Sequence, residues 1–209
     1  MSRFDSIDQA LQDVRQGKLV IVVDNEDREN EGDLVFAASL ATTELMAFTI
    51  RHTAGFICCA VDSERLDALQ IPLMIENNTD PNGTQYTVTV DAKKSSTNNV
   101  STGISAHDRA VTVRSLADFS SSDPHAFTRP GHIVPLRPNP LGLKARCGHT
   151  EATIALCKLA GLPPVGVLSE LINEDGSMMR RNDCAAFAAK HNLTIVSIAD
   201  LAEYENSSK

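Results

Sequence analysis

The stretch Leu19–Ala38, LVIVVDNEDRENEGDLVFAA, decides what this chain can fold into. It begins with five consecutive aliphatic residues, Leu19–Val23, and a run of this length and type predicts a strand that is buried on both faces. The polar segment Asp24–Asp33 follows, and a second apolar run, Leu34–Ala38, comes directly after it. The stretch therefore predicts two core strands that hold an acidic loop at both of its ends.

Outward from this stretch, helices and strands alternate without a strict strand–helix–strand rhythm. The sequence predicts further strands at 56–61, 86–90 and 165–171, of which 86–90 is half-exposed, and helices at 105–114 and 150–159. Such a mixture favours an α+β fold with a mixed sheet over a doubly wound fold. No repeat or Pro/Gly/Ser-rich linker divides the chain, so a single domain is expected over residues 1–209.

The charge and composition exclude some classes of protein. The chain has 19 basic and 27 acidic residues, a formal net charge of −8, 4% aromatic residues and no Trp. A broad nucleic-acid surface needs clustered Lys and Arg, and single-strand binding relies on stacked aromatic rings, so no nucleic-acid partner is expected. The aliphatic run Leu19–Val23 is far shorter than the ~20 residues of a membrane span, so no membrane segment is expected.

The cysteines and the N-terminus indicate a reducing compartment. The five cysteines are odd in number and include no Cys-x-x-Cys pair, which argues against a disulfide framework or a thiolate zinc site. The first residues lack the apolar core of a signal peptide, because Asp5, Asp8 and Asp13 interrupt them. A cytoplasmic location is therefore expected.

The acidic loop is the most unusual part of the chain. The segment Asp24–Asp33 holds six acids and one base, Arg28, and carries five of the eight net negative charges. In an extended segment side chains alternate, which would place Glu29, Glu31 and Asp33 on one side. Such carboxylates repel one another, and a hard divalent cation such as Mg²⁺ takes oxygen ligands. The alternative is a solvated acidic loop, which is the usual state of a charge run.

A second polar segment, Arg146–Glu151, has the sequence RCGHTE and opens a predicted helix. Free N–H groups at a helix N-terminus bind anions, and Gly148 would let the backbone approach one. Arg146 could add a bidentate contact to a phosphate, and His149 could ligate a metal or carry protons. The alternative is an ordinary helix cap formed by Thr150.

Two further titratable residues lie beside apolar ones. His132 precedes Ile133 and Val134, where a packed structural histidine is the alternative. Glu170 lies inside an apolar strand, where desolvation would raise the pKa of its carboxyl and suit it to general acid–base catalysis. Together with the acidic loop and the helix start, these groups predict a metal-dependent enzyme that acts on a small phosphorylated compound.

Five motifs are similar, in the same order, to those of the 3,4-dihydroxy-2-butanone 4-phosphate synthase family of riboflavin biosynthesis. They are Asp24 with RENEGD at 28–33, TGISAHDR at 102–109, RPGH at 129–132, RCGHTEA at 146–152 and GVLSEL at 166–171. The resemblance spans about Asp5 to Leu201. Some relatives carry a C-terminal GTP cyclohydrolase II domain, and this chain is expected to be the stand-alone form.

The resemblance implies a lyase that converts D-ribulose 5-phosphate to L-3,4-dihydroxy-2-butanone 4-phosphate and formate. The implied course is enolisation, loss of water, skeletal rearrangement, rehydration and elimination of C4. The resemblance also implies two divalent cations per site, Mg²⁺ or Mn²⁺, a three-layered α+β fold, and a homodimer with sites near its interface. Two alternatives stay open: another metal-dependent sugar-phosphate isomerase or aldolase, and a non-catalytic module that binds a cation through its acidic loop.

The family motifs also imply roles for individual residues of this chain. The metal ligands would be Glu29 and His149. The substrate-binding residues would be Arg28, Glu29, Asp33, Thr102, Arg146, Cys147, Gly148, His149, Thr150 and Glu170. The catalytic set would be His132 and Glu170 as proton-transfer groups, with Asp24, Glu31 and Cys58 at further active-site positions. For Cys58 a redox-sensitive thiolate and a packed thiol both stay open, and the acidic loop and residues 93–101 are the expected lids.

Overall fold

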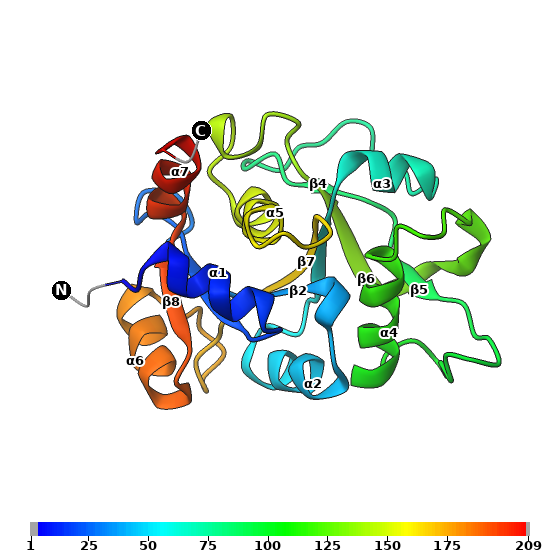
Figure 1. The fold of residues 1–209 in the computed structure, drawn as a ribbon, viewed down its shortest axis with the longest axis horizontal. Coiled ribbons are helices and arrows are strands. Elements are labelled where there is room, and N and C mark those ends of the chain that lie inside the picture. The colour runs from blue at the N-terminus through cyan, green and yellow to red at the C-terminus, as the bar shows by residue number, and fades with distance from the viewer. Residues whose placement is uncertain (1–3, 208–209) are drawn as a thin grey trace.

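A mixed sheet runs through the computed structural model, which describes residues 4–207 (Figure 1). The strand order is β4-β6-β3-β7-β2-β1-β8, and β5 pairs with β6 beside this path. The strands are β1 (Val20–Val23), β2 (Gly32–Ala37), β3 (Cys58–Val61), β4 (Gln85–Tyr86), β5 (Val90–Ala92), β6 (Phe127–Arg137), β7 (Val165–Glu170) and β8 (Thr194–Ser197).

The helices lie on both sides of this sheet. They are α1 (Ile7–Arg15), α2 (Thr43–His52), α3 (Ser63–Ala68), α4 (Ala106–Leu116), α5 (His149–Leu159), α6 (Arg181–His191) and α7 (Ile198–Ser207). Short 3₁₀ turns lie at η1 (Ala38–Leu40), η2 (Pro124–Ala126) and η3 (Gly142–Lys144). Within residues 4–207 no helix combines the length and the apolar character that crossing a bilayer requires.

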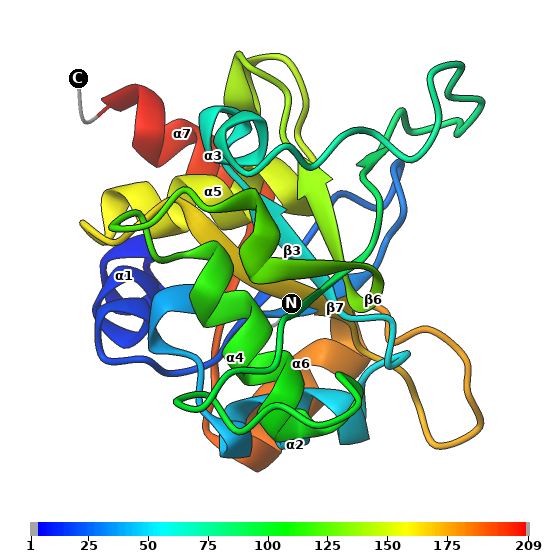
Figure 2. The same cartoon turned by 90° about the vertical axis from the view of Figure 1, so that its right-hand side faces the viewer.

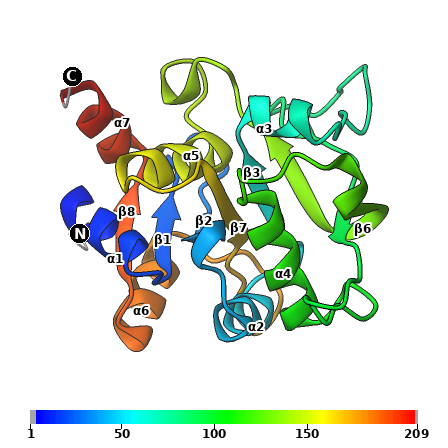
Figure 3. The same ribbon diagram turned by 45° about the vertical axis from the view of Figure 1, so that its right-hand side comes forward.

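Two hydrophobic cores, one on each face of the sheet, explain the unbroken aliphatic run at 19–23. Val20 and Val22 of β1 pack in the core formed with α1, α5 and α7. Ile21 and Val23 point the other way, into the core formed with α2, α3, α4 and α6. Figure 3 shows β8, β1, β2, β7, β3 and β6 from left to right. β1 is antiparallel to β2 and parallel to β8, so the expected three-layer α+β fold with a mixed sheet is confirmed.

The strand register brings the end of the acidic loop and Glu170 to the same end of the sheet. β2 and β7 are antiparallel, and Asp33 lies directly opposite Glu170. β3 lies between β7 and β6 and pairs with both of them. His132 therefore lies in β6, two strands away from the strand that carries Glu170.

The segment 86–90 differs from the single half-exposed strand that its alternation predicts. It divides between β4 and β5, which both pair with β6. Thr87 is fully buried, and its hydroxyl donates to the carbonyl of Pro135 at 2.9 Å. β6 itself is the longest strand, and the sequence conceals it because residues 128–132, TRPGH, are polar or turn-forming.

Candidate active site

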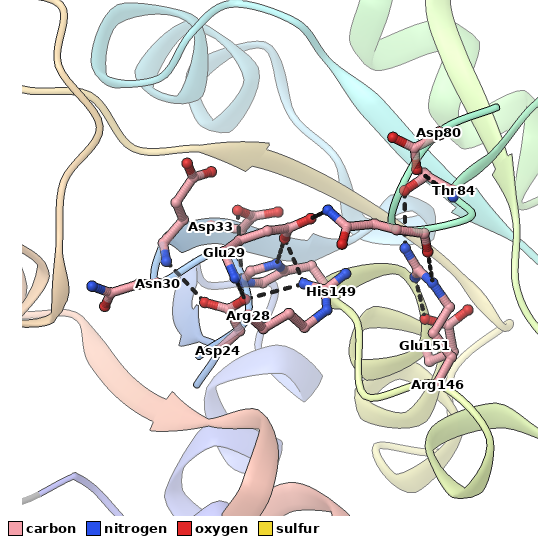
Figure 4. A network of polar contacts seen from close by, with 12 residues as sticks. Asp24, Arg28, Glu29, Asn30, Asp33, Asp80, Thr84, Arg146, His149 and Glu151 are labelled. Atoms are coloured by element: carbon pink, nitrogen blue, oxygen red, sulfur yellow. Dashed lines mark hydrogen bonds and ion pairs between the residues drawn. The ribbon is translucent and has the colours of Figure 1, made fainter. Parts of the chain in front are cut away.

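A cavity of about 230 Å³ opens where the acidic loop, the ends of β2 and β7 and the first turn of α5 meet. Nine of the residues that the sequence assigns to the site line it: Arg28, Glu29, Glu31, Asp33, Cys58, Arg146, His149, Thr150 and Glu170. The side chains of Thr84, Tyr86, Leu136 and Leu168 complete the lining. Figure 4 shows the carboxylates of Glu29 and Asp33 close to the ring of His149.

Asp24 organises the acidic loop. Its buried carboxylate accepts the backbone N–H of Glu29 at 2.9 Å and that of Glu31 at 2.8 Å. The chain turns around this carboxylate, and Asn30 adopts the left-handed conformation with φ 54°. The expected extended segment is therefore wrong before Glu31, but Glu29, Glu31 and Asp33 still reach one cavity because the turn directs Glu29 into it.

Glu29, His149 and Asp33 form a charged group in this cavity. Nδ1 of His149 lies 3.4 Å from Oε2 of Glu29, and Nε2 of His149 lies 3.8 Å from Oδ1 of Asp33. Burial opposes protonation of His149, but the carboxylates of Asp33 and Glu29 outweigh it and raise the pKa of His149 to about 9. The hydrogen bond with His149 lowers the pKa of Glu29 to about 2, and burial raises the pKa of Asp33 to about 7. The group therefore holds a proton that a bound cation would displace.

The same group offers ligand atoms for a divalent cation. One oxygen of Asp24, one of Glu29 and one nitrogen of His149 lie within 4.8 Å of one another. Among the described residues, Oδ1 of Asp33 and Nε2 of His149 are buried without a hydrogen-bond partner. Buried polar atoms without partners are costly, so these two atoms fit a site that binds a polar ligand or a cation. Carboxylate oxygens and an imidazole nitrogen fit Mg²⁺ or Mn²⁺.

Glu170 faces the cavity from the end of β7, beside Asp33. Burial raises the pKa of its carboxyl above the ordinary value, and the negative charge of Glu29 acts in the same direction. A carboxyl in this environment holds its proton closer to neutral pH, which suits it to both accepting and donating a proton. Glu170 therefore has the surroundings of a general acid–base group.

Cys58 lies in β3 at the wall of the cavity and is only 4% exposed. Burial, together with the negative charges of Glu170 and Asp33, raises the pKa of its thiol well above the ordinary value. Because the thiolate is the reactive form of cysteine, these surroundings favour a protonated, packed thiol over a redox-sensitive one.

The first turn of α5 lies at one side of the cavity. The helix begins at His149 with Gly148 as its N-cap, so Thr150 lies inside the first turn and does not cap it. A Cβ on Gly148 would overlap the guanidinium of Arg146, so a larger residue here would displace that side chain. Gly148 has no side chain to cap the first N–H groups, and such groups suit an anion. The exposed Cys147 lies outside the cavity lining.

Arg146 connects α5 to a segment that the sequence did not assign to the site. Its Nη1 donates to Glu151 at 2.6 Å, its Nη2 to the hydroxyl of Thr84 at 2.9 Å, and its Nε to the carbonyl of Asn82 at 3.1 Å. The amide of Asn82 in turn donates to Oε1 of Glu29 at 2.8 Å. The segment 82–84 therefore borders the cavity, whereas the expected lid at 93–101 does not line it.

His132 and Thr102 lie outside the cavity lining and close to each other. Nδ1 of His132 lies 2.6 Å from Oδ2 of Asp91, and the backbone N–H of His132 donates to Oδ1 of Asp91 at 2.8 Å. A Cβ on Gly103 would overlap Asp91 and approach His132, so the segment that carries Thr102 packs against this pair. The side chain of His132 is 41% exposed, and Thr102 is exposed as well.

Sequence reasoning missed Asn82, Thr84 and Asp91. Asn82 stands in an Asn-Gly pair that indicates only a turn, and the backbone N–H of Gly83 indeed donates to the carbonyl of Asp80 at 3.0 Å. Thr84 and Asp91 stand beside ordinary strand residues, and their partners lie about 40 to 60 positions away. An aspartate in a strand that is expected to be buried needs a polar partner. That requirement could have indicated a partner for Asp91.

The chain is similar to known proteins over almost its whole length. A family model described as 3,4-dihydroxy-2-butanone 4-phosphate synthase matches residues 8–204. The chain is 51% identical over 200 residues to the 3,4-dihydroxy-2-butanone 4-phosphate synthase of Schizosaccharomyces pombe, covering 95% of this chain and 96% of that protein. It is 52% identical over 204 residues to the riboflavin biosynthesis protein RibBA of Salinispora arenicola, covering 98% of this chain and 47% of that longer protein.

Solved structures agree with the sequence relatives. A crystal structure of 3,4-dihydroxy-2-butanone 4-phosphate synthase in complex with two magnesium ions superposes with a TM-score of 0.91 and 45% sequence identity. The superposition covers 98% of this chain and 99% of that chain. A cation-free form of such an enzyme superposes with a TM-score of 0.90 and 42% identity, covering 99% and 100% of the two chains. The chain therefore belongs to the 3,4-dihydroxy-2-butanone 4-phosphate synthase family.

Proposed function

We propose that this chain is a lyase that converts D-ribulose 5-phosphate to L-3,4-dihydroxy-2-butanone 4-phosphate and formate. The observation that carries the proposal is one cavity that joins the Glu29–His149 pair, the adjacent carboxyls of Asp33 and Glu170 and the start of α5. The reaction is inferred from membership of the family. The cavity contains acidic, basic and anion-binding groups of the kinds that this reaction needs.

The position of each residue in the cavity suggests its role. The first turn of α5, from Gly148 to Thr150, binds the phosphate through its N–H groups, and Arg146 adds positive charge beside it. Arg28, Glu29 and Asp33 bind the sugar, while Glu31 and Cys58 shape the wall of the cavity. Glu170 moves protons to and from substrate carbon and oxygen atoms, because its raised pKa suits both directions.

Glu29 and His149 are the proposed protein ligands of two divalent cations, Mg²⁺ or Mn²⁺, and Asp24 lies close enough to contribute. When bound, the cations polarise the substrate carbonyl and offset the charge of an enediolate. Asp24 accepts the backbone N–H groups of Glu29 and Glu31, so the backbone on each side of Asn30 is held before a cation arrives.

We further propose that the chain forms a homodimer, acts as one domain over residues 1–209, and works in the cytoplasm. Thr102 and His132 do not line the cavity. Two large apolar side chains are also exposed, Phe56 at 48% and Ile104 at 50%. A second copy that covers this surface would also enclose His132. All five cysteines are free thiols, which fits a reducing compartment. A monomer in sedimentation velocity runs at micromolar protein would contradict the dimer.

A formate assay tests the activity directly. The purified chain is mixed with D-ribulose 5-phosphate and Mg²⁺, and formate is measured before and after chelation with EDTA and after Mg²⁺ is restored. We expect formate release that chelation stops and Mg²⁺ restores. Conversion among ketoses and aldoses without formate would favour an isomerase or aldolase, and cation binding without turnover would favour a binding module.

Replacing Asp91 by Asn is expected to lower kcat about 10²-fold with little change in KM. The carboxylate accepts Nδ1–H of His132 and so leaves Nε2 as the free proton acceptor, whereas an amide can donate to Nδ1 and reverse the tautomer. Steady-state kinetics of formate release measure the effect, and Asp175→Asn in an exposed turn is the control. An unchanged kcat in Asp91→Asn would contradict a proton-transfer role for His132.

Metal binding near pH 8 is expected to release about one proton per site. In the metal-free protein the pKa of His149 is about 9, so its ring is protonated at that pH and must lose the proton to bind a cation. Metal affinity should therefore rise as the pH rises toward 9 and level off above it. Calorimetric titration with Mn²⁺ in two buffers of different ionisation enthalpy measures the release, and equal heats in both buffers would contradict it.

A further inference from the structure

The acidic loop receives a contact from a distant part of the chain that none of the motifs includes. Arg180, the residue before α6, extends its guanidinium to the loop from about 150 positions away in the sequence. Its Nη1 donates to the carbonyl of Glu29 at 2.7 Å and to that of Asn30 at 2.8 Å. The same nitrogen lies 3.7 Å from Oε1 of Glu31.

With this contact, both the N–H and the carbonyl group of Glu29 are bound by charged side chains. Asp24 accepts the N–H of Glu29, and Arg180 binds its carbonyl oxygen, so a charged side chain holds each side of this residue. Asn30, with φ 54°, turns the chain so that its own carbonyl reaches the same guanidinium. The side chain of Glu29 is 28% exposed, so burial alone does not fix where its carboxylate lies.

Arg180 is itself held in place by the start of α6. It is the N-cap residue of that helix, and its backbone N–H donates to the carboxylate of Asp183 at 3.0 Å. The helix start thus fixes the position from which the guanidinium extends. Figure 2 shows that the orange segment before α6 and the turquoise-to-green segment after α3 project on the same side of the molecule.

We infer that Arg180 is a positioning residue for the metal site: by binding the carbonyl oxygens of Glu29 and Asn30, it keeps the Glu29 carboxylate beside His149. The inference rests on the proposed function, because it takes Glu29 and His149 as metal ligands. Residues that hold metal ligands in place typically contribute about 10- to 100-fold to metal affinity. A guanidinium also reduces the repulsion within the loop before a cation arrives.

The adjacent Arg181 provides a matched control. It is also an arginine at the start of α6, and it points to the same loop, where its Nη1 lies 3.8 Å from Oε1 of Glu26. The side chain of Glu26 is 74% exposed, so this is a surface ion pair and not a backbone contact. Removing either arginine takes the same charge from the same helix start, but only Arg180 contacts the backbone of the ligand residue.

The experiment compares Arg180→Met, Arg180→Lys and Arg181→Met with the unaltered protein. Mn²⁺ is titrated without substrate, and free Mn²⁺ is followed by electron paramagnetic resonance. We expect about a tenfold or greater loss of Mn²⁺ affinity in Arg180→Met, a smaller loss in Arg180→Lys, and a change of less than about twofold in Arg181→Met. Formate release at saturating Mn²⁺ should recover in Arg180→Lys, with a higher Mn²⁺ requirement.

Several results would overturn the inference. Equal Mn²⁺ affinity in Arg180→Met and the unaltered protein would show that the guanidinium does not position the ligand. Equal losses of Mn²⁺ affinity in Arg180→Met and Arg181→Met would show that the effect comes from the removal of one positive charge and not from the backbone contact. Unaltered protein that binds no Mn²⁺ would remove the proposed metal site and the inference with it, whereas the first two results leave the proposed function intact. If Arg180→Met does not fold, the comparison of Arg180→Lys with Arg181→Met decides in the same way.

Discussion

Replacing His149 by Ala is expected to abolish both metal binding and turnover. The ring is buried and its two nitrogens lie near Glu29 and Asp33, so no other described side chain can take its place as the nitrogen ligand of this group. A bound divalent cation supplies several kcal/mol of stabilisation to a developing enediolate, and its loss corresponds to a fall in kcat of about 10³-fold or more. Formate release and a Mn²⁺ titration measure the two effects.

The control for this prediction is His125→Ala, because His125 is exposed in η2 and does not line the cavity. It should keep full activity and metal affinity. His149→Asn is a second variant that keeps a polar side chain in the buried position. Mn²⁺ affinity equal to that of the unaltered protein in both His149 variants would contradict the proposed metal site.

Replacing Glu170 by Gln is expected to lower kcat about 10²- to 10⁴-fold while metal affinity stays within a few-fold. The amide keeps the size of the carboxyl but cannot exchange a proton. The variant should also be the more stable protein, by about 1 kcal/mol in the free energy of unfolding. Burial raises the pKa of Glu170, and the negative charge of Glu29 acts in the same direction, so the ionised carboxylate is disfavoured in the folded state.

Kinetics and thermal unfolding of the same preparations test both parts of the Glu170 prediction. Glu174→Gln is the matched control, since it makes the same change four residues later in an exposed turn and should alter neither quantity. A Glu170→Gln variant with normal kcat would remove Glu170 from the proton-transfer role. A large loss of stability would show that the carboxylate supports the fold, which its surroundings do not indicate.

The sequence predicts those parts of the fold in which local pattern and burial agree. The strand at 20–23 follows from five aliphatic residues in a row, and the helix α4 follows from Ser105, whose hydroxyl accepts the N–H of Asp108 at 3.0 Å. β6 and the split at Thr87 could not be predicted. Their stability comes from pairing with distant strands, which the polar stretch at 128–132 does not reveal.

The candidate site shows the same division. The acidic run and the RCGHTE segment contain so many functional groups that their residues stand out, and nine of those assigned by sequence do line one cavity. What the sequence could not supply is the set of neutral or distant partners. The bond from Asn82 to Glu29 and that from Arg180 to the same residue cross 53 and 151 positions, and each depends on the finished fold.

The parts of the chain that line or border the cavity differ in how closely the rest of the fold packs around them. Asp33, His149 and Glu170 belong to the sheet or to α5, which lies between the sheet and the helices α1 and α7, so these positions are constrained by packing on several sides. Asn82 belongs to an exposed turn. An inhibitor that gains its affinity from the first group would contact residues whose replacement also disturbs the packing of the sheet or of α5. One that depends on the turn would contact a residue whose replacement disturbs little packing.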